Sequence, residues 1–403
     1  MPVSLLIKSI LTRRKQTCSM ELRNFFKEKK EKPISKQAYF KARQNLNPQV
    51  FTYLNDKYLK TFYSSSKEVK TWNDYIILAI DGSKVEIPNS EENRQEYGVL
   101  KNHSGTESPA RAMVSGLFDV FNKFFIDLQI CSVGKSELDA AKENLLAIGR
   151  IGITQKAIVI FDRGYPGFEI LYYLEKLGLK YIIRLSSNKF KEERKNAKSD
   201  DEEIFLKIYD KRLQNVKAKD IKLFEEMRNL EHIKTRLVRQ TSPSGEEFAV
   251  FTNISQEMNA KEICETYFLR WKIEQAYNTL KNKMKFESVS GNASIYVKQD
   301  FLSQILIYNL IEDMITYVEE NMLKEEEEKL KYRRKINENM AIGLFSQEAI
   351  KIFLEENDKK RLKLTKSLQK EMGNYLLPER LSPSKKRKFL TSNKYASNQK
   401  NSF

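Results

Sequence analysis

Two short apolar runs, each ending in an aspartate, constrain most strongly what this chain can fold into. The run YIILAIDG leads to Asp81, and the run KAIVIFDRG leads to Asp162. Continuous stretches of Ile, Val and Ala are typical of strands that a sheet buries on both faces. Ligands of open α/β sheets bind outside the carboxyl ends of such strands, so both aspartates are predicted to lie at a ligand site. An Asp-Gly pair is also a common turn, which makes Asp81 a weak signal when it is taken alone.

The segments around these runs predict an α/β fold. Residues 110–133 read as two strands with a tight turn between them, and with the first run they make an antiparallel meander of three strands. A helical pattern at 136–149 precedes the second run, and a further helix at 168–178 and a strand at 180–185 follow it. Such alternation favours parallel strands with helices packed on the sheet. We therefore predict a mixed five-stranded sheet with helices on both faces.

The rest of the chain is predicted to be mainly helical, apart from one insertion. The runs IKTRLVRQ and EEFAVFTNI flank a turn at 241–245, so the insertion is expected to be mainly β. The tail after Asp358 is strongly basic and is expected to be poorly ordered. The predicted segments are a helical DNA-binding region at 1–70, the first part of the core at 71–186, the insertion at 187–261, the second part of the core at 262–320, and a helical region with the basic tail at 321–403.

The clearest helix of the first segment begins after Ser35, a plausible N-cap. Its apolar residues, Tyr39 among them, form one face, and Lys36, Lys41 and Arg43 are expected to point elsewhere. Two interpretations stay open for this basic helical module. It is either a DNA-binding surface or a helical cap with solvated lysines.

Composition limits the classes of partner and cofactor. The chain carries 71 Lys or Arg against 54 Asp or Glu, a net charge of +17, which suits a nucleic-acid partner. Three widely spaced cysteines favour a reducing compartment, and with only two histidines any metal is expected to be held by carboxylates. The first residues lack the pattern of a secretory signal, and no apolar run approaches membrane-spanning length. A soluble, cytoplasmic protein without membrane contact is expected.

The stretch 261–286 reads as one helix with an unusual set of charges. At about 100° per residue, Arg270, Glu274 and Lys281 fall within about 60° of one another, with Tyr267 at the edge of this stripe. An ordinary surface ion pair between Arg270 and Glu274 is the simple alternative. However, apolar residues overlap the charged stripe, so the charges are expected to face something other than bulk water.

Two aspartates at the ends of adjacent strands and a glutamate from a helix across them fit a two-metal site for phosphoryl transfer. Mg²⁺ prefers oxygen ligands, and two such ions would stabilise the attacking and the leaving oxygen. Asp81, Asp162 and Glu274 are the predicted catalytic and metal-binding residues. No Ser, Cys or His nucleophile is indicated, so water or a DNA 3′-hydroxyl is expected to attack. Tyr267, Arg270 and Lys281 are the predicted DNA-binding residues, because they could contact the phosphate beside the scissile bond.

These residues carry a resemblance to a known family. Tyr267, Arg270, Glu274 and Lys281 match the Y-x2-R-x3-E-x6-K signature of the IS-four family of bacterial insertion-sequence transposases of the DDE type. LAIDGSKVEIP around Asp81 and IVIFDRGYPGF around Asp162 resemble the two earlier acidic motifs, and SKQAYFKAR resembles the N-terminal region. The resemblance covers about residues 35 to 350.

The resemblance implies an RNase H-like catalytic core with an insertion between the second Asp and the Glu. It also implies two Mg²⁺ ions, for which Mn²⁺ is expected to substitute, and cut-and-paste movement of an element bounded by inverted repeats. The expected partners are double-stranded DNA, both element ends and target, and a second copy of the chain in the synaptic complex. Some members hold a flipped base with a tryptophan of the insertion. Trp72 and Trp271 lie outside that segment, so hairpin intermediates are not implied here.

Three functions follow as hypotheses. The first is an active transposase associated with the bacterial nucleoid. The second is a catalytically silent DNA-binding regulator of transposition, and the third is a plain metal-dependent nuclease. Intact acidic residues favour the active enzyme over the regulator, and end-specific cutting with strand joining would separate it from the nuclease.

Overall fold

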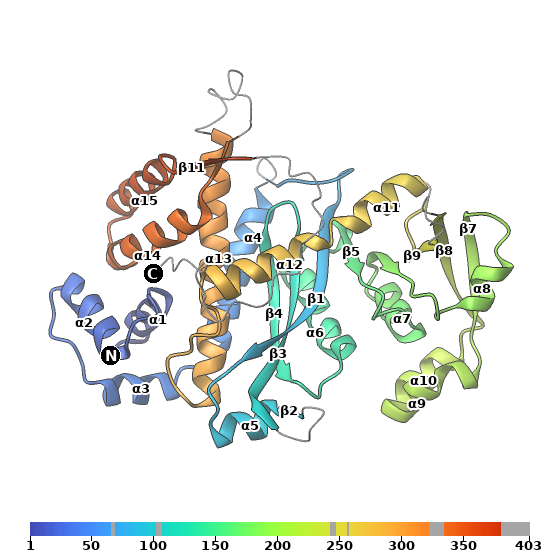
Figure 1. Cartoon of the computed structure of the whole chain (residues 1–403), viewed down its shortest axis with the longest axis horizontal. Coiled ribbons are helices and arrows are strands. Elements are labelled where there is room, and N and C mark those ends of the chain that lie inside the picture. Colours follow the sequence, from blue (N-terminus) through green and yellow to red (C-terminus); the bar gives the residue numbers. More distant parts are fainter. Residues whose placement is uncertain (66–68, 102–106, 242–246, 256–257, 322–333, 380–403) are drawn as a thin grey trace, which may run out of the picture. The chain divides into compact units, whose positions relative to one another are not determined.

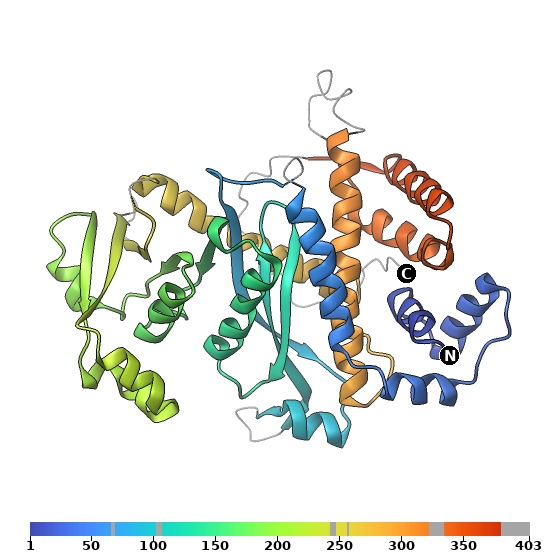
Figure 2. The same cartoon turned by 180° about the vertical axis from the view of Figure 1, so that it is seen from behind.

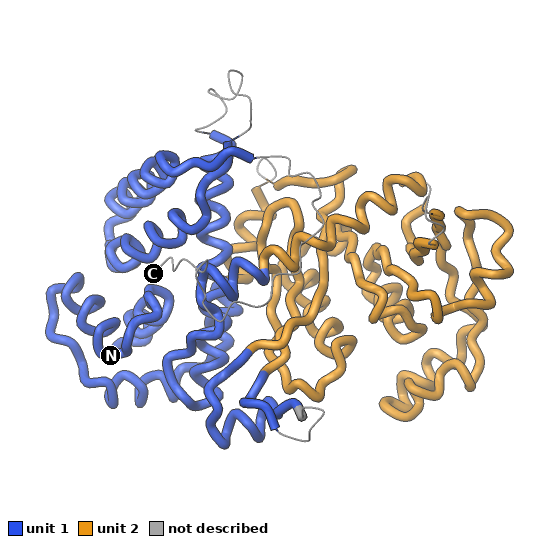
Figure 3. The backbone as a smooth tube through the Cα atoms, in the orientation of Figure 1, with its two compact units in different colours: residues 1–54, 86–111, 277–403 blue, residues 55–85, 112–276 orange. Residues whose placement is uncertain are grey.

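The computed structural model describes residues 1–65, 69–101, 107–241, 247–255, 258–321 and 334–379. The chain forms two compact units (Figure 3), each built from segments that lie far apart in the sequence. Unit 1 comprises residues 1–54, 86–111 and 277–403, and unit 2 comprises residues 55–85 and 112–276. These units cut across the five predicted segments, whose division stays a prediction.

The sheet has the predicted order and directions (Figure 1). β5 is parallel to both β1 and β6, and β3 is antiparallel to β4. The Val120 amide donates to the Ile77 carbonyl and the Ile87 amide to the Ala110 carbonyl, so β1 and β3 run antiparallel. The predicted α/β core with a mixed sheet is therefore confirmed. Its strands lie in the order β4 (Phe124–Ser132), β3 (Glu107–Asp119), β1 (Ile76–Glu86), β5 (Ala157–Phe161) and β6 (Lys180–Arg184).

One face of the sheet packs against helices of unit 2 (Figure 2). These are α6 (Glu137–Ile151), α7 (Phe168–Lys176) and the second half of α4 (Gln49–Ser64), and a 3-10 turn at Thr154–Lys156 precedes β5. Successive side chains of a strand point to opposite faces. The buried cluster on this face contains Ile76, Leu78, Ile80, Val159, Phe161, Leu145, Ile148, Leu171 and Leu174.

The insertion extends the same sheet. β9 (Glu247–Thr252) pairs antiparallel with β6, and β8 (His232–Thr241) and β7 (Asp201–Lys207) follow. The predicted hairpin is confirmed, although residues 242–246 at its turn lie outside the described residues. The segment also contains α8 (Lys191–Asn196), a 3-10 turn (Asp210–Leu213), α9 (Gln214–Lys219) and α10 (Ile221–Arg228). The prediction of a mainly β insertion did not include these helices, which bury a small core of Leu213, Val216, Phe224 and Met227.

Unit 1 is largely helical. In the part of the chain that the structure describes, no helix is both long and apolar enough to cross a bilayer. The short strands β10 (Arg334–Ile336) and β11 (Leu376–Pro378) pair antiparallel. The helices are α1 (Val3–Leu11), α2 (Cys18–Lys29), α3 (Lys36–Gln44), α5 (Glu91–Tyr97), α13 (Ser294–Asn321), α14 (Glu338–Leu354) and α15 (Asp358–Met372), with β2 (Val99–Lys101) beside β3.

The expectation that Arg43 points away from the packed face of α3 is wrong. Its side chain is fully buried and donates to Asp300 of α13 at 2.8 Å and to Gln299 at 2.8 Å. Arg13 contacts the same carboxylate at 2.6 Å. A buried carboxylate needs cations and hydrogen-bond donors, and Asp300 obtains them from both N-terminal arginines.

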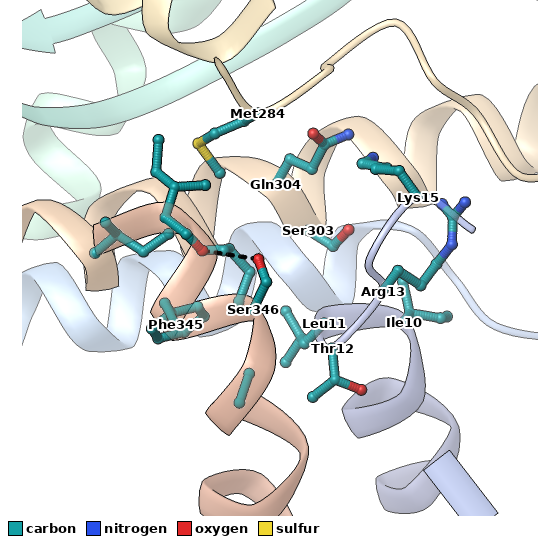
Figure 4. Close-up of a pocket in the computed structure, with 14 residues that line it drawn as sticks. Ile10, Leu11, Thr12, Arg13, Lys15, Met284, Ser303, Gln304, Phe345 and Ser346 are labelled. Atoms are coloured by element: carbon teal, nitrogen blue, oxygen red, sulfur yellow. Dashed lines mark hydrogen bonds between the residues drawn. The ribbon is translucent and has the colours of Figure 1, made fainter. Parts of the chain in front are cut away.

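A small pocket within unit 1 lies beside Arg13, between α1, α13 and α14 (Figure 4). Apolar side chains of all three helices line it, among them Leu11, Ile307 and Phe345. The hydroxyl of Ser346 is directed back to its own helix, where it donates to the Ile342 carbonyl at 2.9 Å. None of the predicted site residues lines this pocket, so it belongs to the packing of the helices rather than to the predicted chemistry.

The expectation of poor order after Asp358 is wrong for residues 358–378. Asn357 caps α15 by accepting from the Lys360 amide at 3.1 Å, and Leu368 and Met372 are buried. This helix packs against α13 and α14. Two apolar residues four positions apart are enough to anchor a basic helix when a neighbouring face is available. Residues 380–403 lie outside the described part of the chain.

Candidate active site

The two aspartates stand at equivalent positions of parallel neighbours. Ala79 of β1 pairs with Ile160 of β5, and Asp81 and Asp162 each follow two residues later. Both side chains therefore belong to the sheet face opposite the α6–α7 core. Each carboxylate accepts a local backbone bond, Asp81 from the Gly82 amide at 2.9 Å and Asp162 from the Gly164 amide at 2.7 Å. The predicted strand-end position is confirmed for Asp162, which directly follows β5, but it is wrong for Asp81, because β1 continues to Glu86. Asp81 lies within β1, two residues beyond its last pair with β5.

The prediction of one continuous helix over 261–286 is wrong. The segment folds as α11 (Ala260–Phe268), α12 (Trp271–Asn278) and a π-helical turn (Thr279–Lys283), shown in Figure 1. A capping box between Asn259 and Glu262 begins α11. At the break, backbone bonds change to the tighter i to i−3 pattern, as in the bond from the Arg270 amide to the Tyr267 carbonyl. The simple 100° projection therefore does not hold across Arg270 or beyond Asn278.

Arg270, at this break, joins two of the predicted ligands. Its guanidinium lies 3.4 Å from Asp81 Oδ2 and donates to Glu274 Oε1 at 2.9 Å. The ion pair between Arg270 and Glu274 that the simple alternative foresaw is thus present. It is not an ordinary surface pair, because the Arg270 side chain is only 8% exposed and also reaches β1.

The charges of Asp162 and Glu274 both act on Asp81. Burial raises the pKa of Asp81 to about 6, and the nearby Asp162 and Glu274 raise it further, while Arg270 and the Gly82 amide oppose the change. Burial lowers the pKa of Arg270, but Asp81, Tyr267 and Glu274 together outweigh burial and raise that pKa overall. The site is therefore rich in negative charge that one guanidinium only partly compensates.

The donor set fits a hard divalent cation in its chemistry. The negative charges of Asp162 and Glu274 raise the pKa of the Asp81 carboxyl, so a cation would be favoured there. Carboxylate oxygens are ligands that suit Mg²⁺ or Mn²⁺. As the side chains stand, the described residues contain no group of three carboxylate, His or Cys side chains close enough to hold a metal ion. Arg270 lies between Asp81 and Glu274, so these ligands would converge on a metal only after its guanidinium turned away.

Tyr267 and Lys281 have surroundings that the sequence did not indicate. Tyr267 is 2% exposed, its ring packs 5.2 Å from that of Phe248, and its hydroxyl bonds Arg270. Lys281 belongs to unit 1, where burial lowers its pKa and Glu287 and Arg111 are neighbouring charges. The DNA contacts of both residues stay predictions.

Two residues near the triad were not predicted. The hydroxyl of Tyr165 is buried without a hydrogen-bond partner among the described residues, in the field of Asp81, Glu137 and Asp162. Glu137, the first residue of α6, lies against Gly82. Tyr165 stands three residues after Asp162 and could have been noticed there, but the sequence offers no signal for Glu137.

The transposase DDE domain model matches residues 72–310 of this sequence. The chain belongs to the transposase DDE domain family. This match covers more than half of the chain and includes Asp81, Asp162 and Glu274, and transposase domains of this family depend on divalent cations. It confirms the coarser prediction of a transposase domain of the DDE type.

The other comparisons add little to this assignment. No curated protein matches the sequence. Among solved structures, the piggyBac transposase in a synaptic complex with hairpin DNA is similar at 12% identity and a TM-score of 0.39. That match covers 77% of this DDE transposase chain and 59% of the piggyBac chain. This chain therefore spans less than two thirds of that transposase.

Proposed function

We propose that this protein is an active cut-and-paste transposase of the IS-four family, which moves its own bacterial insertion sequence. The observation that supports this most is the pairing of the buried Arg270 with both Asp81 and Glu274, while the charge of Asp162 acts on Asp81 from the neighbouring parallel strand. A structural ion pair would need one carboxylate for Arg270, whereas a metal site of this family needs three.

In this proposal Asp81, Asp162 and Glu274 hold two Mg²⁺ ions, which Mn²⁺ can replace. When bound, the ions supply Lewis-acid stabilisation of the attacking and leaving oxygens in an in-line displacement at phosphorus. The carboxylates position those ions and offset their charge. The buried strands β1 and β5 hold the backbone at Asp81 and Asp162, so both carboxylates are positioned before DNA arrives.

Arg270 has two successive roles in this proposal. Without metal its guanidinium compensates Asp81 and Glu274, and in the loaded site it turns to the phosphate beside the scissile bond. Tyr267 supports it, because its hydroxyl bonds the Arg270 side chain and helps to raise the pKa of the guanidinium. Lys281 supplies a second phosphate contact.

The partners in this proposal are the inverted-repeat ends, the target DNA and a second copy of the chain. The net charge of +17 supports a polyanionic partner. Exposed lysines of α3, such as Lys36 and Lys41, are candidates for end recognition, whereas Arg43 is excluded from that role by its burial.

A donor plasmid that carries the gene with its own flanks tests the proposal. Native protein with Mg²⁺ is expected to release the element, with cuts that map to its inverted repeats. Cuts scattered over the plasmid would instead identify a nuclease. A footprint on the ends without any cut would identify the silent regulator.

A further inference from the structure

A fourth carboxylate approaches β1 beside Asp81 from the other face of the sheet. A Cβ atom placed on Gly82 would lie 3.5 Å from both Cδ and Oε1 of Glu137. Residue 82 points to the face opposite Asp81, because side chains alternate along a strand. Glu137 begins α6 on that opposite face and its side chain is exposed. The pairing of β1 with β5 ends at Ala79 and Ile160, before Asp81 and Asp162, so the Glu137 carboxylate can reach toward both aspartates where these strands are no longer paired.

Tyr165 gives an independent indication that a ligand belongs at this place. Its side chain is 5% exposed and its ring lies 5.4 Å from that of Phe161, which fixes its position. The hydroxyl has no hydrogen-bond partner among the described residues, yet the charges of Asp81, Glu137 and Asp162 all act on it. A buried hydroxyl in a native protein normally has an acceptor, so a water or an ion with its waters is the missing neighbour.

We propose that Glu137 is an outer carboxylate of the catalytic metal site, which binds a metal-bound water together with the hydroxyl of Tyr165. This inference rests on the proposed function, since it concerns the same site. Mg²⁺ keeps several of its waters when it binds to proteins, and outer partners of those waters strengthen metal binding. Glu137 then acts as a positioning residue, whereas Asp81, Asp162 and Glu274 remain the direct ligands.

Titration of the full chain with Mn²⁺, followed by electron paramagnetic resonance of the free ion, tests this inference. Glu137→Gln keeps the shape of the side chain and is expected to weaken Mn²⁺ binding by about 10- to 100-fold. Asp139→Asn is the matched control, because it removes one charge from the same helical turn. Asp139 faces Lys142 at 3.5 Å and Lys219 at 3.7 Å, and its loss is expected to leave Mn²⁺ affinity unchanged.

Tyr165→Phe provides a second variant that removes only the hydroxyl. It is expected to weaken Mn²⁺ binding less than Glu137→Gln does. The double variant is expected to bind no more weakly than Glu137→Gln, because both residues hold the same water. If the losses in Mn²⁺ affinity of the two single variants added fully in the double variant, the two residues would not hold the same water.

The outcomes separate this inference from the proposed function. If Glu137→Gln binds Mn²⁺ as tightly as the native protein, or no more weakly than Asp139→Asn, the role of Glu137 is overturned and the triad is unaffected. If the native protein binds no Mn²⁺, the metal site of the proposed function is itself contradicted.

Discussion

At the scale of single residues, Arg270 occupies the place between Asp81 and Glu274 where a metal ion would compensate the same charges. Replacing Arg270 by Gln is expected to lower the free energy of unfolding of the metal-free protein by about 1–3 kcal/mol at neutral pH, because the half-buried Asp81 and the more exposed Glu274 lose their charged donor. Mg²⁺ is expected to restore more stability to this variant than it adds to the native protein. Thermal unfolding with and without Mg²⁺ measures both effects.

Arg150 provides the control for this prediction. It also contacts two carboxylates of unit 2, Asp127 at 3.0 Å and Asp56 at 2.9 Å. Arg150→Gln is also expected to lower the free energy of unfolding, but adding Mg²⁺ should not restore it. Equal recovery in both variants would contradict a metal site at Arg270.

The raised pKa of Asp81 predicts that metal binding depends on pH. A metal ligand must be ionised, and with a pKa of about 6 Asp81 keeps its proton below that pH. Metal affinity is therefore expected to fall as the pH falls through 6, by up to about tenfold per pH unit, and to level off above it. Mn²⁺ titrations between pH 5 and 7.5 check this. A Mn²⁺ affinity that stays constant over this range would show that metal binding does not require ionisation of Asp81.

The two aspartates could be selected from the sequence because each directly follows an apolar run, and Glu274 because it stands in a four-residue signature. The burial of Tyr267 and the approach of Glu137 could not be predicted in this way. Both depend on which elements meet in space. Glu137 lies more than fifty residues from Gly82 in the sequence, and only the packing of α6 on the sheet brings them together.

At the scale of secondary-structure elements, the N-terminal helices are anchored by buried charges rather than by an apolar face alone. Arg43→Ala is expected to destabilise the protein by about 3–5 kcal/mol, because Asp300 would stay buried with one cation fewer. Lys41→Ala, at an exposed position of the same helix, is expected to cost less than about 0.5 kcal/mol. Urea unfolding of the two variants provides the comparison, and equal costs would contradict the buried network.

The broken helix shows where sequence pattern fails at this scale. Residues 261–286 contain neither Gly nor Pro, so nothing local marks the end of α11 at Phe268 or the π-helical turn after Asn278. The tertiary contacts of Arg270 and Tyr267 at the first break are visible only in the structure. The strands and the helices at 137–151 and 168–176 were predictable because their apolar periodicity matches their burial.

At the scale of the whole molecule, net charge governs DNA affinity and its dependence on salt. Residues 380–403 carry seven Lys or Arg and no Asp or Glu. Removing them is expected to flatten the slope of log affinity against log salt by about 0.9 for each DNA phosphate that the tail neutralises in the full chain. Binding of duplex DNA at several salt concentrations measures the slope. An unchanged slope would mean that the tail binds no phosphates.

The order of the central sheet was accessible from the sequence, whereas the composition of the units was not. Alternating patterns predicted the meander and the parallel strands. Unit 1, however, gathers residues 1–54, 86–111 and 277–403, and the ion network of Arg13, Arg43 and Asp300 links the first and last of these segments. Ion pairs between residues so far apart leave no periodic pattern in the sequence. Removing the whole N-terminal segment to test DNA recognition would therefore disrupt unit 1 as well, and single substitutions of exposed lysines are the better test.

The most direct measurement is Mg²⁺-dependent cleavage and joining of a labelled DNA that carries the gene's own flanks, with the native protein and Glu274→Gln side by side. The native protein should cut at the element ends and join the released 3′-hydroxyl to target DNA. Glu274→Gln should bind the same DNA and yield neither product. Cleavage and joining by Glu274→Gln at the native rate would contradict the central claim that Glu274 completes the metal site with Asp81 and Asp162.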